Sequence, residues 1–189
     1  MNIKLFEKNM RLATQAIKHV KNICFLGEAN DRNNKNYIVR AGIVGKYRLA
    51  AQEHAIRTFN AGLGIPLQRY FIQLAAEQAK RHGIGNCMEQ SCLAFEFLKK
   101  KTPVIDVYKI KSLRMQYSNL HDGDHMFVVI GLDIKRTSTL LPINEMCLWN
   151  RETVICDPWN NDAYPAYMYT VKAIFGGGWH LIEHAYGKN

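Results

Sequence analysis

The sequence predicts an α+β domain, in which a helical first half packs against an antiparallel sheet formed by the second half. In the first half, apolar residues recur at intervals of three and four, which is typical of amphipathic helices. In the second half, short apolar runs lie between turn residues, which is typical of strands. The chain of 189 residues is long enough to form one core, so we treat 1–189 as a single domain, helical at about 1–101 and strand-rich at about 103–189.

Three helices are expected ahead of a glycine-rich break at residue 83. The first covers residues 3–20, and its apolar stripe consists of Ile3, Phe6, Met10, Ala13, Ile17 and Val20. The next two cover 47–60 and 66–81, because glycine in the connecting turn ends one and Pro66 begins the other. Residues 30–36 are polar and are expected to form a loop.

A central helix is expected from Cys87 to about Lys100. The Gly-Ile-Gly-Asn run breaks the preceding helix, Asn86 is a favourable N-cap, and Glu89 can reach back to it as in a capping box. Apolar residues continue through the helix, as expected of a buried one. Backbone N–H groups and the helix dipole stabilise a thiolate at such an N-terminus, and the same groups can stabilise an oxyanion. Cys87 is therefore a candidate nucleophile.

The sheet half contains two candidate partners for that thiol, His125 and Asp157. Strands are expected at 104–111, 125–132, 148–157 and 166–173. If the second and third pair antiparallel, His125 at the start of one lies opposite Asp157 at the end of the other. Asp124 is nearer in sequence but points to the opposite face. Pro158 stops the strand, and Trp159 is placed to cover the hydrogen bond between His125 and Asp157.

These motifs resemble those of the papain-like cysteine peptidase and transglutaminase-like superfamily, including bacterial effectors and toxins. The matching pieces are Gly-x-Gly-x-Cys, Asp-His-x-Phe-Val-Val and Val-Ile-Cys-Asp-Pro-Trp, spread over residues 78–165. The resemblance implies a papain-like fold, Cys87 as nucleophile, His125 as general base and acid, and Asp157 as the orienting carboxylate. It also implies an amide of a protein as substrate, and no cofactor or metal.

The oxyanion-hole glutamine of the papain pattern has no match at its usual spacing, since Arg81 stands there. Gln78 and the Asn86 side chain are alternative candidates. The reaction is open between peptide cleavage and action on a side-chain amide. The transglutaminase-like elements favour the side-chain amide, with Trp159, Tyr164, Tyr167 and Tyr169 walling a narrow approach unless these aromatics are core residues.

The remaining cysteines are expected to be buried thiols. A single cysteine at a helix start is more often a small buried hydrophobe than a nucleophile, and only the ordered set with His125 and Asp157 favours an enzyme. Cys92 faces another side of its helix, and Cys24, Cys147 and Cys156 lie among apolar residues. Five cysteines without framework spacing predict reduced thiols and a cytoplasmic setting, unless a specialised secretion route delivers the protein into a host cell.

A rival motif lies near the C-terminus, where His180, Glu183 and His184 match the His-x-x-Glu-His pattern of zinc hydrolases. On a helix, this spacing places two imidazoles on one face. The context is poor, because glycines precede the motif and few residues follow. A third ligand would have to come from upstream, with His121 or Asp122 as candidates.

The formal charge of +9 raises the question of anionic partners. The basic residues are scattered, and the one tight cluster, 99–101, sits at a helix C-terminus, where cations complement the dipole. We therefore expect acidic proteins or anionic membrane surfaces as partners ahead of nucleic acid. A non-catalytic binding module on the same fold is the alternative function. The N-terminus lacks the uninterrupted apolar stretch of a signal peptide.

Overall fold

The computed structural model describes residues 1–27, 35–60, 67–102, 105–112, 124–132, 149–168 and 179–184, and it confirms the α+β class. The helices in these ranges are α1 Ile3–Ile23, α2 Tyr37–Asn60, α3 Leu67–His82 and α4 Cys87–Leu98. The strands are β1 Ile105–Ser112, β2 Asp124–Ile130, β3 Val154–Asp157, β4 Asp162–Pro165 and β5 Trp179–His184, and a short 3-10 helix covers Ala166–Met168. None of the described helices is long and apolar enough to cross a bilayer.

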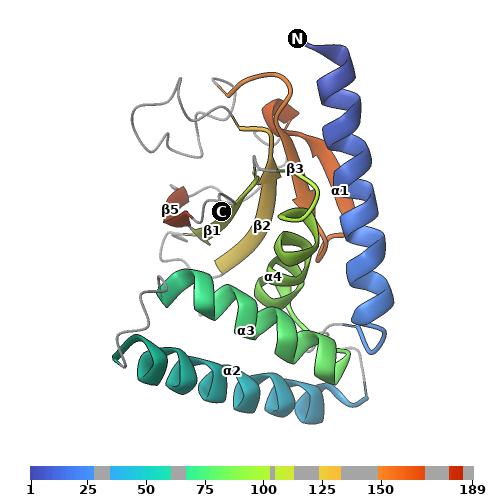
Figure 1. The fold of residues 1–189 in the computed structure, drawn as a ribbon. Helices are drawn as coiled ribbons and strands as arrows, with labels where there is room; N and C mark the ends of the chain where they lie inside the picture. Colours follow the sequence, from blue (N-terminus) through green and yellow to red (C-terminus); the bar gives the residue numbers. More distant parts are fainter. Residues whose placement is uncertain are drawn as a thin grey trace, which may run out of the picture.

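The strands form one antiparallel sheet in the order β4-β3-β2-β1-β5. Helix α4 packs against β2, while α1 runs beside β3 and β4, and α2 and α3 lie together beyond α4 (Figure 1). The helix that starts at Cys87 is thus enclosed by other elements, and eight of its twelve residues are buried. This arrangement agrees with the predicted central helix.

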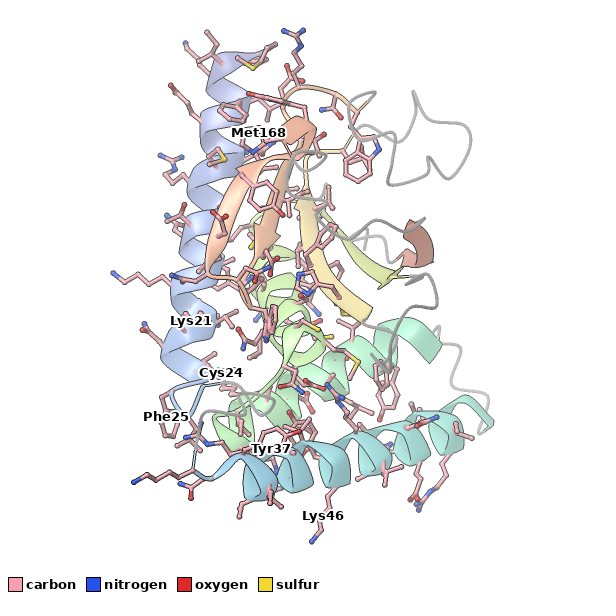
Figure 2. All side chains as sticks on the ribbon, turned by 180° about the vertical axis from the view of Figure 1, so that it is seen from behind. Lys21, Cys24, Phe25, Tyr37, Lys46 and Met168 are labelled. Atoms are coloured by element: carbon pink, nitrogen blue, oxygen red, sulfur yellow. The ribbon has the colours of Figure 1, made fainter. Side chains whose placement is uncertain are left out.

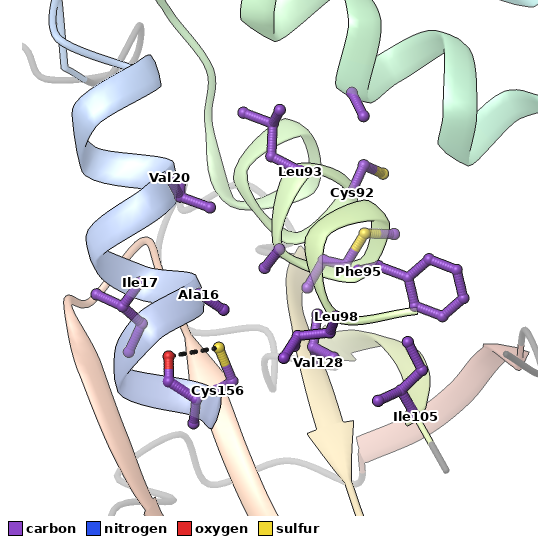
Figure 3. Packing of buried hydrophobic residues seen from close by; sticks show 14 of the residues in the cluster. Ala16, Ile17, Val20, Cys92, Leu93, Phe95, Leu98, Ile105, Val128 and Cys156 are labelled. Carbon is purple, nitrogen blue, oxygen red and sulfur yellow. Dashed lines mark hydrogen bonds between the residues drawn. The ribbon is translucent and has the colours of Figure 1, made fainter. Parts of the chain in front are cut away.

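Helix α1 connects the two halves of the protein through its buried stripe. Asn2 caps it by accepting a hydrogen bond from the Leu5 N–H at 3.2 Å. Its Ala16, Ile17 and Val20 pack into the main core together with residues of α4 and β2 (Figure 3). The Cys156 thiol of β3 donates to the Ala13 carbonyl of α1 at 3.6 Å, shown as the dashed line in Figure 3.

A second connection joins α1 to the turn after β2. Gly131 has a φ of 78°, which favours glycine, and a Cβ there would lie 2.3 Å from the Asn9 amide nitrogen. The same amide donates to the Glu152 carbonyl at 2.9 Å, and Asn9 is buried. The first helix is therefore anchored to a segment that follows it by more than a hundred residues.

Several predicted boundaries were wrong. Helix α2 begins at Tyr37 rather than at residue 47, because Val44 and Tyr47 pack on Ile84 and stabilise a glycine-containing stretch of low helix propensity. Strand β3 begins at Val154 rather than at 148, because a turn precedes it, with the Thr153 N–H donating to the Asn150 carbonyl at 3.0 Å.

At the C-terminal end the expected strand at 166–173 begins instead with the 3-10 helix Ala166–Met168, and residues 169–173 lie outside the described residues. The preceding strand β4 and the final strand β5 were not predicted. The predicted turn at 62–66 and most of the loop at 30–36 also lie outside the described residues.

Candidate active site

The N-terminus of α4 presents Cys87, which is its first residue and is partly exposed. Asn86 is the N-cap with extended backbone, and its N–H donates to the Glu89 carboxylate at 2.9 Å. The predicted cap is therefore confirmed. The other described cysteines, Cys24, Cys92 and Cys156, are buried as predicted, whereas Cys147 lies outside the described residues.

The Glu89 carboxylate is fully buried and is neutralised by Arg48 of α2. Arg48 donates from Nε to Oε1 at 2.5 Å and from Nη2 to Oε2 at 2.9 Å, a bidentate pair. Burial acts to lower the pKa of Arg48, but the hydrogen bonds and charge of Glu89 outweigh it and raise that pKa. Sequence reasoning missed Arg48, because it lies 41 positions from Glu89 and no local pattern connects them.

Two further hydrogen bonds fix the loop that leads into Cys87. The Tyr47 hydroxyl of α2 donates to the Ile84 carbonyl at 3.1 Å, and the Gln90 side-chain amide donates to the Gly85 carbonyl at 2.8 Å. Gly85 itself has no space for a side chain, since a Cβ would lie 2.7 Å from Cβ of Glu89. The backbone just before Cys87 is therefore held from both α2 and α4.

On the sheet side, His125 and Asp157 are in direct contact. His125 Nε2 lies 2.7 Å from Oδ2 of Asp157, whose carboxylate is buried. Asp157 also accepts from the backbone N–H of Asn160 at 3.2 Å and from its side-chain amide at 2.7 Å. These bonds hold the carboxylate in place, so it can orient the imidazole.

The register of β2 and β3 differs from the prediction. Val128 pairs with Cys156, so one step further along the strands Phe127 faces Asp157. His125 is therefore the diagonal neighbour of Asp157 on the same face of the sheet, not the residue directly opposite. The predicted contact still forms, because a diagonal neighbour lies within reach of a long side chain.

The Cys87 thiol completes the group, because it is hydrogen-bonded to the His125 ring. Burial alone would lower the pKa of His125, but hydrogen bonds and charge interactions with Asp157 and Cys87 raise it to about 9. Since Nε2 faces Asp157, Nδ1 is the nitrogen left for the sulfur. A pKa of about 9 favours the charged form of the imidazole at neutral pH.

Ser91 connects the two sides of the site. Its hydroxyl, one turn of α4 after Cys87, donates to the Met126 carbonyl at 2.7 Å, and Ser91 is buried. Met126 directly follows His125 in β2. This bond therefore fixes the distance between the helix that carries the thiol and the strand that carries the imidazole.

Two aromatic rings lie near the imidazole of His125. The Trp159 ring centroid lies 5.4 Å from that of His125 at 57°, and Phe127 lies 6.0 Å away at 48°. Trp159 thus lies beside the His125 ring, while its covering of the hydrogen bond to Asp157 stays a prediction. Tyr164 is a buried residue of β4, which agrees with the alternative that these aromatics are core residues. Tyr167 is exposed, and Tyr169 lies outside the described residues.

The remaining predicted residues are the oxyanion-hole candidates, the zinc motif and the proposed third zinc ligands. Of the two oxyanion-hole candidates, Asn86 directly precedes Cys87 in the chain. Gln78 is half-buried on α3 and does not take part in the described hydrogen bonds of the site.

The zinc motif lies in β5, a strand, so the helical spacing on which a zinc site would depend is absent. Its proposed third ligands, His121 and Asp122, lie outside the described residues. The residues that are described contain no cluster of three or more metal-binding side chains.

Comparison of the chain with protein-family models, with curated proteins and with solved structures found no match.

Proposed function

We propose that this chain is a thiol-dependent acyl-transfer enzyme with a papain-like or transglutaminase-like fold, in which Cys87, His125 and Asp157 form the catalytic triad. One observation carries the proposal: three separate elements, α4, β2 and β3, bring a helix-start thiol, an imidazole and a buried carboxylate into one hydrogen-bonded chain. The raised pKa of His125 supports it, because a charged imidazole can both stabilise the thiolate and later donate a proton.

The reaction follows from these positions. The Cys87 thiolate attacks the carbonyl carbon of an amide, and the backbone N–H groups at the start of α4 stabilise the oxyanion. The His125 imidazolium gives its proton to the amide nitrogen, the carbon–nitrogen bond breaks, and ammonia or an amine leaves. Water or a second amine then attacks the thioester while His125 takes its proton, and the Cys87 thiolate is released. Asp157 keeps the imidazole oriented throughout.

The proposed substrate is the side-chain amide of a protein glutamine or asparagine. The transglutaminase-like sequence elements support this choice, as does the indole of Trp159 beside His125, which suits a narrow approach better than a long peptide groove. Tyr164 gives no support, because it is buried. Peptide-bond cleavage is the alternative outcome of the same chemistry.

The test uses an unfolded protein rich in glutamine and lysine as substrate. We expect the wild type to release ammonia and to form a thioester on Cys87 that is seen in the intact mass after acid quenching. Cys87→Ala and His125→Ala should do neither. Products with the mass change of an amide converted to an acid, or joined to an added amine, indicate a side-chain amide, whereas fragments indicate a peptidase. If neither thioester nor product forms with any substrate, the alternative of a non-catalytic binding module is favoured.

A further inference from the structure

The outer face of α2, which turns away from the rest of the described protein, carries Ile38, Leu49 and Ile56 together with Gly42 and Gly45, and the exposed polar residues Gln52 and Glu53 flank them. At about 3.6 residues per turn, Ile38, Leu49 and Ile56 lie within roughly 20° of one another around the helix axis, with the two glycines between them. Ile38 is 82 % exposed, Leu49 63 % and Ile56 46 %. A solvent-facing helix surface is normally polar, so this face requires an explanation.

The inner face of the same helix already accounts for its packing. Val44, Tyr47, Ala51 and Ala55 are buried toward the protein, and Arg48 pairs with Glu89. A Cβ at Gly42 or Gly45 would meet no atom within 4 Å, so neither glycine is required for packing inside the protein. The outer apolar residues therefore stabilise nothing within the described part of the chain.

The charges beside this face indicate its partner. Helix α2 has a single acidic residue, Glu53, which pairs with Arg57. Of its other basic residues, Arg48 binds Glu89 inside the protein, which leaves Arg40 and Lys46 outside the described ion pairs. Figure 2 shows Lys46 extending away from the protein body on the side of α2 that is remote from α3. Pairing with a second copy would bring like charges together in a chain of formal charge +9. An anionic lipid surface complements both the apolar residues and the cations.

We propose that the outer face of α2 docks on the surface of an anionic lipid bilayer, with Ile38, Leu49 and Ile56 inserted among the lipids and Lys46 near the headgroups. The inference is independent of the proposed enzymatic function. Arg48 points from the opposite side of the same helix toward the Cys87 loop. Docking would therefore leave the contacts of the candidate site unchanged while it holds the chain at the membrane surface.

The experiment is co-sedimentation of the full chain with vesicles of phosphatidylcholine alone or mixed with phosphatidylserine. We expect binding to the mixed vesicles to exceed binding to phosphatidylcholine at least tenfold. It should weaken as salt is raised, because screening shortens the range of the charge attraction. Leu49→Glu should reduce binding at least tenfold, and Lys46→Gln by a smaller factor that disappears at high salt.

Ile3→Glu is the matched control, since Ile3 is 60 % exposed but lies on α1. It should bind as the wild type does, and so should Cys87→Ala. Because Leu49 is exposed, Leu49→Glu should keep the wild-type circular dichroism spectrum and melting temperature. Equal loss of binding in Ile3→Glu, or no binding to the mixed vesicles, would overturn the proposal. A wild-type dimer in solution that Leu49→Glu converts to monomer would instead assign the face to a second copy.

Discussion

The two sides of the candidate active site each contain a buried carboxylate, but they use it differently. On the helix side, Glu89 binds Arg48 and the Asn86 N–H, so it fixes the backbone that presents the thiol. On the sheet side, Asp157 binds the His125 ring and Asn160, so it fixes a side chain. The comparison indicates that substitutions on the helix side should change mainly stability, whereas those on the sheet side should change mainly thiol reactivity.

The largest expected effect concerns the reactivity of Cys87 toward iodoacetamide near pH 6. Cys87 should react at least about a hundredfold faster than Cys24, because burial raises the pKa of Cys24 to about 12 and leaves almost no thiolate. His125→Ala should slow the reaction of Cys87 by roughly tenfold or more, because the cation that pairs with the sulfur is lost. Peptide mass mapping of the labelled protein measures both rates. In urea, where the protein is unfolded, all thiols should react at similar rates. Similar rates in the folded protein would count against an activated nucleophile.

A second effect on the sheet side depends on pH. The pKa of His125 is about 9 in the folded protein and about 6.5 in the unfolded chain, so the folded state binds the proton more tightly. The resulting stabilisation is fully present below pH 6.5 and is lost as the pH rises through 9. Its size is at most about 3 kcal/mol. The difference in unfolding free energy between wild type and His125→Gln should therefore shrink from pH 6 to pH 9.5 in urea titrations. A difference in unfolding free energy that stays constant from pH 6 to pH 9.5 would contradict the raised pKa of His125.

On the helix side, Glu89→Gln should lower the free energy of unfolding by about 2–3 kcal/mol. Removing one member of a buried ion pair typically costs about 3–5 kcal/mol, and the partial exposure of Arg48 reduces the cost. Glu53→Gln is the matched control, because it removes an exposed carboxylate of α2 that also pairs with an arginine, and it should change stability by less than about 0.5 kcal/mol. Equal effects of the two substitutions would show that the buried pair does not brace the loop.

The smallest effect is expected where the two sides meet. Ser91→Ala should lower the free energy of unfolding by about 1 kcal/mol, since it leaves the Met126 carbonyl without the hydroxyl donor. It should also slow the alkylation of Cys87, because the spacing between thiol and imidazole loosens. Thr14→Ala removes an exposed hydroxyl that donates to the Met10 carbonyl and should change neither quantity. An unchanged alkylation rate in Ser91→Ala would limit Ser91 to a structural role.

The sequence predicted those parts of the site that depend on local signals. The cap at Asn86, the helix that starts at Cys87, the start of β2 and the end of β3 each have a pattern of neighbouring residues, so the three side chains that meet at the candidate site could be predicted. Arg48 and Ser91 have no such pattern, because their partners lie on other elements and only the packed fold brings them together. The sequence also did not predict the β2–β3 register, in which His125 is diagonal to Asp157, because the residues between the two strands do not determine it.

The early part of α2 was not predicted to be helical, because its local sequence disfavours a helix. Its glycines and β-branched residues disfavour a helix locally, and the helix forms because Val44 and Tyr47 find contacts near Ile84. β5 was missed for a similar reason: its backbone pairs with β1, which is distant in sequence. Tertiary contacts thus decide the elements that local propensity leaves open.

The anchoring of α1 to Glu152 and Cys156 has a consequence for synthesis of the chain. Helix α1 cannot make these contacts until the turn and strand that hold Asn9 and Ala13 have been translated. The same delay separates Cys87 from His125 and Asp157, which are made later. On a nascent chain the Cys87 thiol therefore has neither the imidazole nor the carboxylate beside it, and the candidate site forms only after Asp157 has been translated.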